Sequence, residues 1–548
     1  MEEEKKIEGA AETAYLETVK REGTDSDNLV ADARAATEAE HRLTLRQGLK
    51  RYPKAVAWSL LISTCIIMTG FDVVLLGSFY GLPQFNKRYG VQLPDGTYTI
   101  KTAWQAGLSN GGKVGEIIGL TLNGWAMERF GCRKTSITAL TCLIGFIALS
   151  VFAKNIEMLL VGQIFCGCCF GVFETLTVTY AAELAPVALR PYLTAYVNLC
   201  WVIGQVISSG VLRGVLNLQS EWAYRLPFAL QWIWPVPLIV GITFAPESPW
   251  WQVRKGHPEE ARRTLGRLFS GATDEELDNT LAMIQHTNEF EKSVAAGTSY
   301  LDCFKGTDLR RTEIACGVWM IQNLCGSAFM GYSTFFLQQA GVPVSASFSL
   351  SIGQYAIGAA GTVSSWFLMS NLGRRPLYWG GLVVLTVLLI VIGGMGSIPH
   401  SNVSASYGVG GLLLIYTAVY DATVGPVCYT LVSEIPSTRL RAKTVVLSRI
   451  AYNLIAVVNS IIMPYFLNKE ALNWGAKTGY FWGGLCALCA IWTYFRCPEP
   501  RNRTYGELDV LFANRISARK FAQTDADQFA GHGGAVSGKA GEIVVEEK

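Results

Sequence analysis

The chain has 548 residues, of which 50% are hydrophobic, 11% are aromatic and only 16% are charged, and its formal net charge is +3. An average soluble chain carries roughly 25% charged residues, and the mean hydropathy here is +0.27. This composition argues against a soluble enzyme, a disordered scaffold and a nucleic-acid-binding protein. The 14 Cys lie mostly in apolar runs and lack the spacing of zinc or disulfide frameworks, so no metal site is expected.

The chain opens with a polar, acidic tail at residues 1–54, and the apolar run that follows is too long for the core of a signal peptide. A membrane-spanning helix needs roughly 20 mostly apolar residues. Twelve windows meet this need, so we expect an all-α membrane protein with twelve transmembrane helices. The windows are approximately 55–80, 105–126, 135–153, 157–181, 192–213, 226–245, 313–337, 347–369, 376–397, 408–431, 444–467 and 476–496.

The windows fall into an N-terminal half at 55–245 and a C-terminal half at 313–496. Between them lies a polar central segment, 246–312, in which residues 256–292 predict short amphipathic surface helices. A polar C-terminal tail follows at 497–548. Its last part, from Gly531 to Lys548, is rich in Gly, Ala and Glu and is predicted to be disordered.

The positive charges of the loops predict the orientation in the membrane. One side carries 26 Lys and Arg near the spans, and the other side carries eight. Both tails and the central segment are therefore expected in the cytoplasm. Asn402 would then lie outside, where Asn402-Val403-Ser404 matches the N-glycan acceptor pattern.

Three short motifs recur in the two halves at nearly constant spacing. They are a Gly-containing basic loop, a Glu and Pro at a helix end, and a Pro-Glu pair after the last span of each half. The separations are 242, 251 and 252 residues, for Gly131 and Gly373, Glu183 and Glu434, and Glu247 and Glu499. This register predicts two parallel six-helix halves, an arrangement in which transporters hold substrate at the midplane and rock around it.

The repeated motifs also place opposite charges in neighbouring cytoplasmic turns. Exposed ion pairs contribute only about 0–1 kcal/mol each, so many weak pairs would be needed to hold the two halves closed. We expect these residues to form a cytoplasmic gate. Its predicted members are Glu128, Arg129, Arg133, Glu183, Arg190, Arg374, Arg375, Glu434, Arg439 and Arg441.

Further motifs carry a family resemblance. Pro246-Glu247-Ser248-Pro249 precedes Arg254-Lys255-Gly256, and together with the Gly-Arg-Arg loops it is similar to the sugar porter family of the major facilitator superfamily over about 55–512. Within that family the chain most resembles fungal maltose permeases and other α-glucoside:proton symporters. The resemblance implies the major facilitator fold and alternating access. The stretches that carry it include Gly70-Phe71-Asp72, Pro249-Trp250-Trp251, Gly425-Pro426-Val427 and Ser433-Glu434-Ile435-Pro436.

Five charged residues inside the predicted spans are candidates for function, because a charge at a helix centre costs roughly 2.5–3.5 kcal/mol on insertion scales. The resemblance implies that Asp72 binds the driving proton and that Arg449 is its cationic partner. A purely structural ion pair is the alternative. Glu116 is implied as a further coupling residue. Glu174 and Asp421 stand where relatives are expected to have uncharged polar residues, and they are candidate acids of the cavity or its mouth.

Glu116 also lies beside a row of small residues, Gly111, Gly115 and Gly119. This four-residue spacing puts all three on one helix face and predicts the close approach of another helix. Elsewhere the sequence departs from the family pattern: Gln163 stands where many sugar porters have arginine, and Thr69 where some α-glucoside relatives have an acid.

A sugar presents hydroxyls that donate and accept hydrogen bonds and flat C–H faces that pack on aromatic rings. Amides and aromatic residues at helical spacing in the fifth and seventh windows suit this chemistry, and the resemblance adds residues of the tenth and eleventh. The predicted sugar contacts are Asn198, Gln205, Gln322, Asn323, Tyr332, Tyr429 and Asn453.

The sequence thus predicts proton-coupled uptake of a maltose-like α-glucoside across the plasma membrane, with the proton as coupling ion and no other cofactor. The alternatives are a carrier of another sugar, a uniporter, and a non-transporting sugar sensor of the same fold. No catalytic site and no nucleic-acid partner are expected. The expected partners are the sugar and the lipid bilayer, and lysines of the tails are candidate acceptors of ubiquitin.

Overall fold

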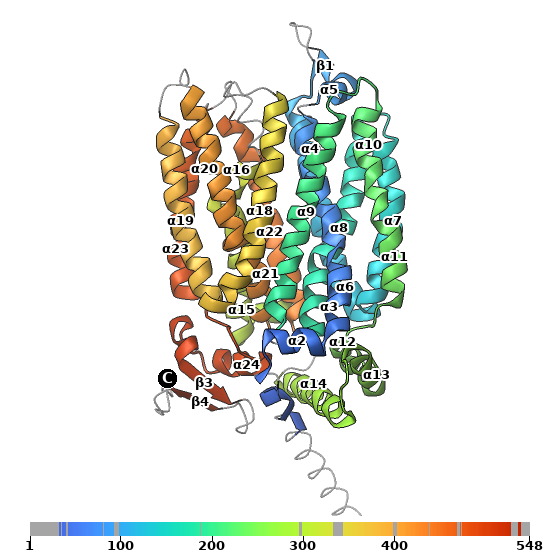
Figure 1. Cartoon of the computed structure of the whole chain (residues 1–548), viewed down its shortest axis with the longest axis vertical. Helices are drawn as coiled ribbons and strands as arrows, with labels where there is room; N and C mark the ends of the chain where they lie inside the picture. The colour runs from blue at the N-terminus through green and yellow to red at the C-terminus, as the bar shows by residue number, and fades with distance from the viewer. Residues whose placement is uncertain are drawn as a thin grey trace, which may run out of the picture.

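The computed structural model describes most of the chain. The described residues are 32–33, 35–39, 42–80, 82–92, 98–186, 188–294, 299–331, 344–397, 403–437, 439–467, 472, 474–527 and 535–538. Long helices run side by side along the length of the molecule (Figure 1). Tyr332 and Asn402, predicted as a sugar contact and a glycan acceptor, lie outside the described residues.

Helices of the N-terminal half occur at each of the first six predicted windows. Two of these windows are interrupted helices, α3 with α4 and α10 with α11, and a Pro begins α11. The elements are α3 (Pro53–Ser63), α4 (Cys65–Phe79), α6 (Thr102–Phe130), α7 (Cys132–Val151), α8 (Ile156–Leu184), α9 (Arg190–Val215), α10 (Trp222–Leu230), η1 (Gln231–Ile233) and α11 (Pro235–Phe244).

The C-terminal half repeats this pattern of long and interrupted helices. Its seventh window contains a π-helical turn, and its tenth is interrupted at Thr423, just before Gly425-Pro426. The elements are α15 (Gly306–Gln322), η3 (Asn323–Ser327), α16 (Ala328–Gly331), α18 (Val344–Leu372), α19 (Arg374–Met395), α20 (Val403–Ala422), α21 (Val424–Glu434), α22 (Arg441–Leu467) and α23 (Thr478–Arg496).

Nine helical spans in the described residues are long and apolar enough to cross a membrane. The other three expected spans are α6, α18 and α23, which are long helices of lower hydropathy. Gly and charged residues dilute α6, Ser and Gly dilute α18, and Gly, Trp and Tyr dilute α23. Their place in the bundle therefore follows from packing: α6 lies against α8, α18 against α20, and α23 against α19.

The two halves stand next to each other, with α3–α11 on one side and α15–α23 on the other (Figure 1). They meet along α9 with α18 and α21, and along α22 with α6 and α8. In the described part of the bundle, helices are interrupted at the first, sixth, seventh and tenth windows. Interrupted helices in membrane carriers mark the places where polar backbone and side chains meet a substrate.

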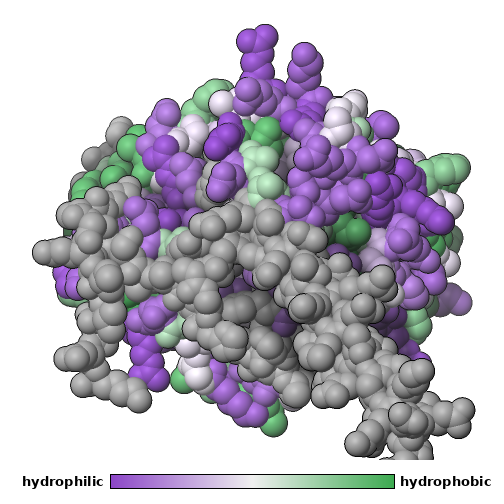
Figure 2. Space-filling model, turned by 90° about the horizontal axis from the view of Figure 1, so that it is seen from below, coloured by the Kyte–Doolittle hydropathy of each residue, from purple (hydrophilic) through white to green (hydrophobic). Residues whose placement is uncertain are grey.

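One end of the bundle, here called the lower face, is covered by short helices from outside the spans (Figure 1). The described part of this face is largely hydrophilic (Figure 2). Its ion pairs join distant segments: Arg51 pairs with Glu276, which lowers the pKa of the Glu276 carboxyl. The covering elements are α2 (Leu45–Arg51), α12 (Pro249–Arg254), α13 (Pro258–Leu268), α14 (Asp274–Val294), η2 (Tyr300–Phe304), α24 (Tyr505–Ala513) and η5 (Ala518–Gln523).

Small β-elements complete the structure. At the end opposite the lower face, α5 (Pro83–Tyr89) is followed by β1 (Val91–Gln92), which pairs antiparallel with β2 (Tyr98–Thr99). In the C-terminal tail, β3 (Thr524–Asp527) pairs antiparallel with β4 (Ala535–Gly538). The prediction of disorder from Gly531 onward is therefore wrong for residues 535–538, where the cross-strand partner supplies hydrogen bonds that composition does not reveal.

Candidate functional site

Asp72 lies in the middle of α4, and its residue is 8% exposed. Its carboxylate accepts a hydrogen bond of 2.8 Å from the side-chain amide of Gln231. Gln231 is the first residue of η1, the short turn that interrupts the sixth span. In the described part of the chain the strongest contact of Asp72 is thus with a neutral group of its own half.

The cation predicted for Asp72 binds a different acid. Arg449 on α22 makes a bidentate pair with Glu174 on α8, with Nε–Oε2 and Nη2–Oε1 distances of 2.8 and 2.5 Å. Both side chains are 2% exposed. The prediction of an Asp72–Arg449 pair is therefore wrong for this structure, because α22 presents Arg449 to α8 and not to α4.

Aromatic rings surround the Arg449 guanidinium. Its carbon Cζ lies 4.1 Å from the ring centre of Tyr452, 4.5 Å from that of Trp319 and 5.4 Å from that of Trp201. These contacts partly replace water around a buried cation. Because Glu174 and Arg449 belong to different halves, this pair is also a bond between the halves, and removing one partner would leave a buried charge uncompensated.

A second ion pair adjoins the first. On α6, the Nζ of Lys113 lies 2.8 Å from both carboxylate oxygens of Glu116, with side-chain exposures of 18% and 4%. Lys113 also interacts electrostatically with Glu174, and Glu116 with Arg449. Two cations and two anions therefore form one cluster across the boundary of the halves.

Lys113 is the member of this cluster that was not among the predicted site residues. It lies near the middle of α6, three residues before Glu116. Residues three apart in a helix are neighbours on one face. The signal was thus available: a lysine inside a predicted span, at the right spacing to neutralise an acid already identified as a candidate.

The glycine row of α6 places this cluster against α8, as the small-residue spacing predicted. A Cβ added at Gly115 would lie 2.0 Å from the backbone oxygen of Ile164, and one at Gly119 would lie 1.9 Å from that of Cys168. On α8, a Cβ added at Gly167 or Gly171 would lie 2.3 Å from a backbone oxygen of α6. Only glycine allows this separation, which brings Glu116 close to Glu174.

Several predicted sugar contacts hydrogen-bond within the protein. Asn198 donates to the hydroxyl of Thr362 across the halves at 3.2 Å, and its amide also interacts with the Asp421 carboxylate. Gln322 donates to the Gly425 carbonyl at 3.0 Å. These amides hold α9, α15, α18 and α21 together in this conformation.

Three of the remaining predicted contacts lie close to the charged cluster. Asn323 donates to the backbone oxygen of Tyr452 at 3.2 Å, and Tyr429 packs edge-on against Trp319 with ring centres 4.8 Å apart. Asn453, one helical turn after Arg449, is fully buried, and neither polar atom of its amide has a hydrogen-bond partner. Gln205 is partly exposed. Among the predicted sugar contacts in the described residues, Asn453 is thus the buried amide that is free to bind a hydroxyl.

The seventh span is interrupted beside these residues. Gly326 has φ = 95°, a conformation that favours glycine, within the π-helical turn η3. The freed carbonyl of Cys325 accepts a hydrogen bond of 2.8 Å from the hydroxyl of Tyr416. π-Helical turns of this kind occur frequently at functional sites, and here the turn begins at the predicted sugar contact Asn323.

At the lower face, the repeated motifs form one matching arrangement in each half. The Glu247 carboxylate accepts backbone N–H bonds from Cys132 and Arg133 at the start of α7 (2.8 and 3.2 Å), and Glu499 accepts them from Arg374 and Arg375 at the start of α19 (3.1 and 3.0 Å). We call these two arrangements the glutamate hubs. Burial raises the pKa of Glu247, and the backbone N–H donors oppose that rise.

Each hub includes a backbone position that only glycine can occupy. Gly131 and Gly373 have φ values of 85° and 91°, and an added Cβ would lie 2.5 and 2.6 Å from a carboxylate oxygen of the hub. The three motif pairs found in the sequence thus describe one structural unit that occurs twice.

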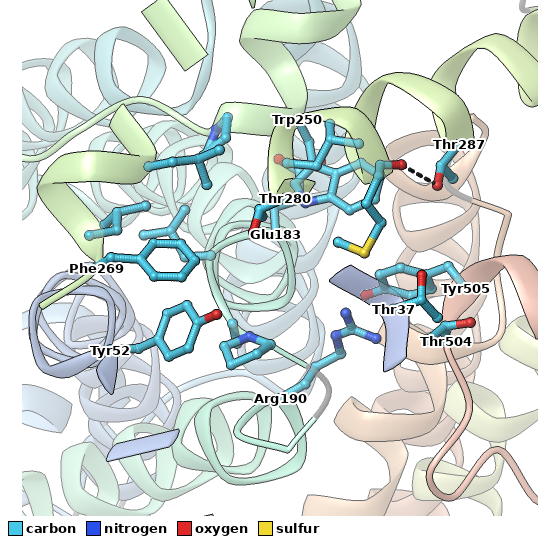
Figure 3. Close-up of a pocket in the computed structure, with 18 of the residues that line it drawn as sticks. Thr37, Tyr52, Glu183, Arg190, Trp250, Phe269, Thr280, Thr287, Thr504 and Tyr505 are labelled. Atoms are coloured by element: carbon cyan, nitrogen blue, oxygen red, sulfur yellow. Dashed lines mark hydrogen bonds between the residues drawn. The ribbon is translucent and has the colours of Figure 1, made fainter. Parts of the chain in front are cut away.

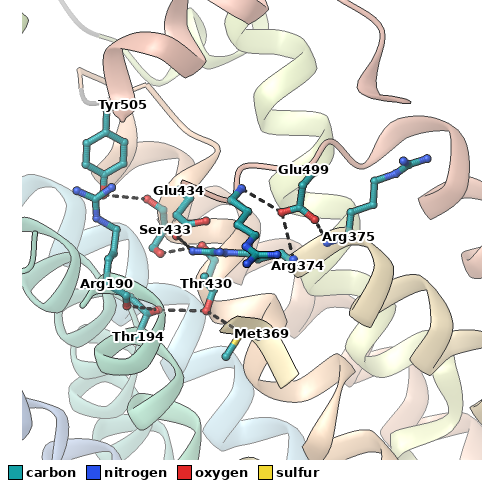
Figure 4. A network of polar contacts seen from close by, with 11 residues as sticks. Arg190, Thr194, Met369, Arg374, Arg375, Thr430, Ser433, Glu434, Glu499 and Tyr505 are labelled. Atoms are coloured by element: carbon teal, nitrogen blue, oxygen red, sulfur yellow. Dashed lines mark hydrogen bonds and ion pairs between the residues drawn. The ribbon is translucent and has the colours of Figure 1, made fainter. Parts of the chain in front are cut away.

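The predicted gate pairs lie mainly within each half, contrary to the expectation that they join the halves. Glu183 pairs with Arg254 of α12 at 2.9 Å and accepts a hydrogen bond from Ser248. Glu434 pairs with Arg374 at 3.0 Å, and both side chains are 5% exposed (Figure 4). The reason is geometric: the hubs bring each glutamate to a basic residue of its own half or of α12.

Other gate residues follow the same rule. Arg439 pairs with Asp308 at 3.2 Å, the Arg375 guanidinium donates to the Tyr494 carbonyl, and Arg129 stacks on the rings of Trp125 and Phe130. Arg133 contributes its backbone N–H to the Glu247 hub.

Some predicted gate residues do interact across the halves at the lower face: the charge of Arg190 acts on Glu434. Glu128 pairs with Lys443 of α22 at 3.4 Å. Arg190 and Arg441, which stand at the same spacing after their repeated glutamates, lie 3.8 and 3.6 Å from the ring centre of Tyr505. Tyr505 belongs to α24, so the C-terminal tail supplies an aromatic ring between one arginine of each half. We call this the tyrosine clamp.

A pocket enclosing about 710 Å³, part of it open to solvent, lies beside the tyrosine clamp. Tyr52 and Phe269 line one part of it, and Trp250, Arg190 and Tyr505 line another (Figure 3). Its lining includes the gate residues Glu183 and Arg190 and none of the predicted sugar contacts. The pocket is therefore a feature of the lower face, separate from the charged cluster.

These features together define a membrane carrier: two similar helical halves, interrupted helices within them, and a charged cluster across their boundary. The chain belongs to the family described as "Sugar (and other) transporter", whose model matches residues 58–512. It is a sugar transporter and not an enzyme, and the predicted resemblance and fold class are confirmed.

Curated relatives and solved structures agree. The chain is 46% identical over 508 residues to the General alpha-glucoside permease of Saccharomyces cerevisiae. The aligned region covers 92% of this chain and 82% of that protein. It is 45% identical over 529 residues to Maltose permease MAL31 of the same species, with coverage of 95% and 85%. The fold matches the proton:xylose symporter XylE bound to 6-bromo-6-deoxy-D-glucose, with a TM-score of 0.73 at 19% identity over 84% of this chain and 100% of that one.

Proposed function

We propose that this transporter takes up an α-glucoside disaccharide such as maltose together with a proton, across the plasma membrane. The names of the relatives, an α-glucoside permease and a maltose permease, support the substrate class. The excess of Lys and Arg supports a cytoplasmic position for the lower face and both termini. Ubiquitin ligation on lysines of the tails stays a prediction.

The observation that carries proton coupling is the setting of Asp72. An ionised carboxylate inside a membrane is costly without a cationic partner, and Asp72 has an amide partner, Gln231. An amide can donate to an ionised carboxylate through its N–H and can accept from a protonated carboxyl through its oxygen. Gln231 can therefore accompany Asp72 in both protonation states.

Sugar binding is assigned to the space between the halves. The Asn453 amide, the rings of Trp319 and Tyr429 and the interrupted seventh span at Asn323 offer hydroxyl partners and aromatic faces together. Sugar that binds there displaces amide contacts such as Asn198–Thr362 and favours the rocking of one half against the other.

Coupling to one proton would drive substantial accumulation. A membrane potential of 100 mV contributes about 2.3 kcal/mol per charge, and one pH unit contributes about 1.36 kcal/mol. At 1.4 kcal/mol per tenfold change, these two terms allow an accumulation of several hundred-fold.

The test is the external pH of a weakly buffered suspension of transport-deficient yeast that expresses the protein. Alkalinisation on addition of maltose, and not of glucose, is the expected result. Asp72→Asn should abolish alkalinisation and accumulation. Asp274→Asn, at a side chain that is 87% exposed, is the matched control and should behave like the wild type.

Two results would contradict the proposal. Entry of labelled maltose without any pH change, with the protein at the cell surface, would identify a uniporter. Neither entry nor a pH change with any sugar of a panel would favour a non-transporting sensor.

A further inference from the structure

We propose that Lys113 is a coupling residue: its ammonium sets the number of protons that the buried cluster needs to become neutral, and it links Asp72 to the Glu174–Arg449 pair. The inference rests on the proton coupling proposed above. It concerns a residue that the sequence pattern of the family did not bring to notice.

The position of Lys113 lets its charge act on three acids inside the N-terminal half: Glu116, Glu174 and Asp72. Its Nζ lies 2.8 Å from both oxygens of Glu116 on its own helix. Its charge also acts on Glu174 of α8 and on Asp72 of α4, and Tyr452 of α22 faces it from the other half. Four helices thus present titratable groups to one ammonium.

Lys113 is also the most exposed charge of the cluster. Its side chain is 18% exposed, compared with 4% for Glu116 and 2% for both Glu174 and Arg449. A lysine has three N–H donors on a flexible stem. It can therefore shift between carboxylates as the halves move, whereas the bidentate guanidinium of Arg449 is held by its aromatic neighbours.

A charge count shows what Lys113 does for coupling. Lys113 and Arg449 balance Glu116 and Glu174, so the four-residue cluster is neutral as drawn by its two ion pairs. An ionised Asp72 adds one negative charge, and a single proton removes it. The loaded carrier then turns over without net buried charge, which avoids the cost of an unpaired ion in the membrane.

Removal of the lysine charge changes this count by one. In Lys113→Met, the cluster with ionised Asp72 carries two negative charges in excess, and two protons are needed for neutrality. In the double variant Lys113→Met/Glu116→Gln, one cation and one anion are lost together, and one proton suffices again. Lys113→Arg keeps the charge.

The experiment measures the initial rate of maltose uptake against external pH, in the alkaline range where the rate falls. We expect the rate to fall about tenfold per pH unit for the wild type, Lys113→Arg and the double variant, and about a hundredfold for Lys113→Met. Lys101→Met, at an exposed lysine that precedes the same helix, is the matched control and should follow the wild type. Exchange of labelled maltose with both sides at one acidic pH reports whether each variant still binds and turns over.

The outcomes separate the inference from the proposed function. A wild type without maltose-driven alkalinisation refutes proton coupling and the inference with it. A coupled wild type whose slope is shared by Lys113→Met refutes the inference alone. If Lys113→Met fails to reach the membrane, the test rests on the double variant Lys113→Met/Glu116→Gln. The charge count is overturned if this variant still exchanges maltose but its uptake rate depends on external pH more steeply than that of the wild type, or not at all.

Discussion

Replacement of Gly115 by alanine tests the contact between α6 and α8 that positions the charged cluster. The new Cβ would lie 2.0 Å from the backbone oxygen of Ile164, whereas real Cβ atoms essentially never approach closer than 3.0 Å. The obstacle is backbone, so no side chain can rotate away. The two helices must separate by at least about 1 Å, and Glu116 would move away from Glu174 with them.

The expected cost follows from overpacking. Extra methyl groups in well-packed cores destabilise by about 1–3 kcal/mol, and occasionally by more. For a unit of 150–250 residues, each kcal/mol lowers the melting temperature by about 2–4 °C. Gly115→Ala should therefore melt several degrees below the wild type. Gly112→Ala is the matched control, because nothing lies within 4 Å of a Cβ added there.

Both variants can be assayed in detergent by thermal unfolding followed with size-exclusion chromatography, and in cells by maltose uptake. We expect Gly112→Ala to retain wild-type stability and Gly115→Ala to lose both stability and uptake. Equal melting temperatures for the two variants would show that α6 and α8 do not approach as closely as described, and the placement of Glu116 beside Glu174 would fall with that result.

Three further predictions concern the lower face. Arg374→Met should cost about 3–5 kcal/mol in thermal unfolding, because Glu434 stays buried without its partner, and the double variant with Glu434→Met should cost less. Tyr505→Ala should increase hydrogen exchange in the first turns of α9 and α22, whereas Tyr505→Phe should not, because the phenyl ring keeps both arginine contacts. The Arg51 guanidinium lowers the pKa of Glu276, so this pair stabilises the docking of α14 above the ordinary carboxyl pKa, and the effect is lost as pH falls through the lowered value. Glu276→Gln should remove it at neutral pH; since both side chains are more than a third exposed, the effect on proteolysis of α14 should correspond to less than about 1 kcal/mol.

Periodicity and repeats predicted much of the architecture. Gly115 and Gly119 were expected to admit a neighbouring helix because their spacing puts them on one face, and α8 is that neighbour. The repeated Glu247 and Glu499 were recognised by their offset. The offset did not reveal their role as acceptors for helix N-termini, because that depends on how the chain returns to α7 and α19.

The sequence could not predict which side chains on different helices of the bundle would pair. The family resemblance implied that Arg449 is the partner of Asp72, but neither a resemblance nor the charges along single helices say which helix faces meet. The expected pairing of Glu183 across the halves was wrong for the same reason, because Glu183 pairs with Arg254 on the covering helix α12. Tyr505 gave no signal because its role exists only where two distant arginines converge on α24.

The bond between Glu174 and Arg449 also has a consequence for biosynthesis. The two residues are 275 positions apart in the chain. At 5–20 residues per second, the ribosome delivers Arg449 roughly 14–55 seconds after Glu174. During that interval Glu174 lies among residues of its own half only, and Lys113 is one cation of that half that acts on it. Lys113, which we assign to coupling, thus also provides a positive charge near Glu174 until Arg449 has been synthesised.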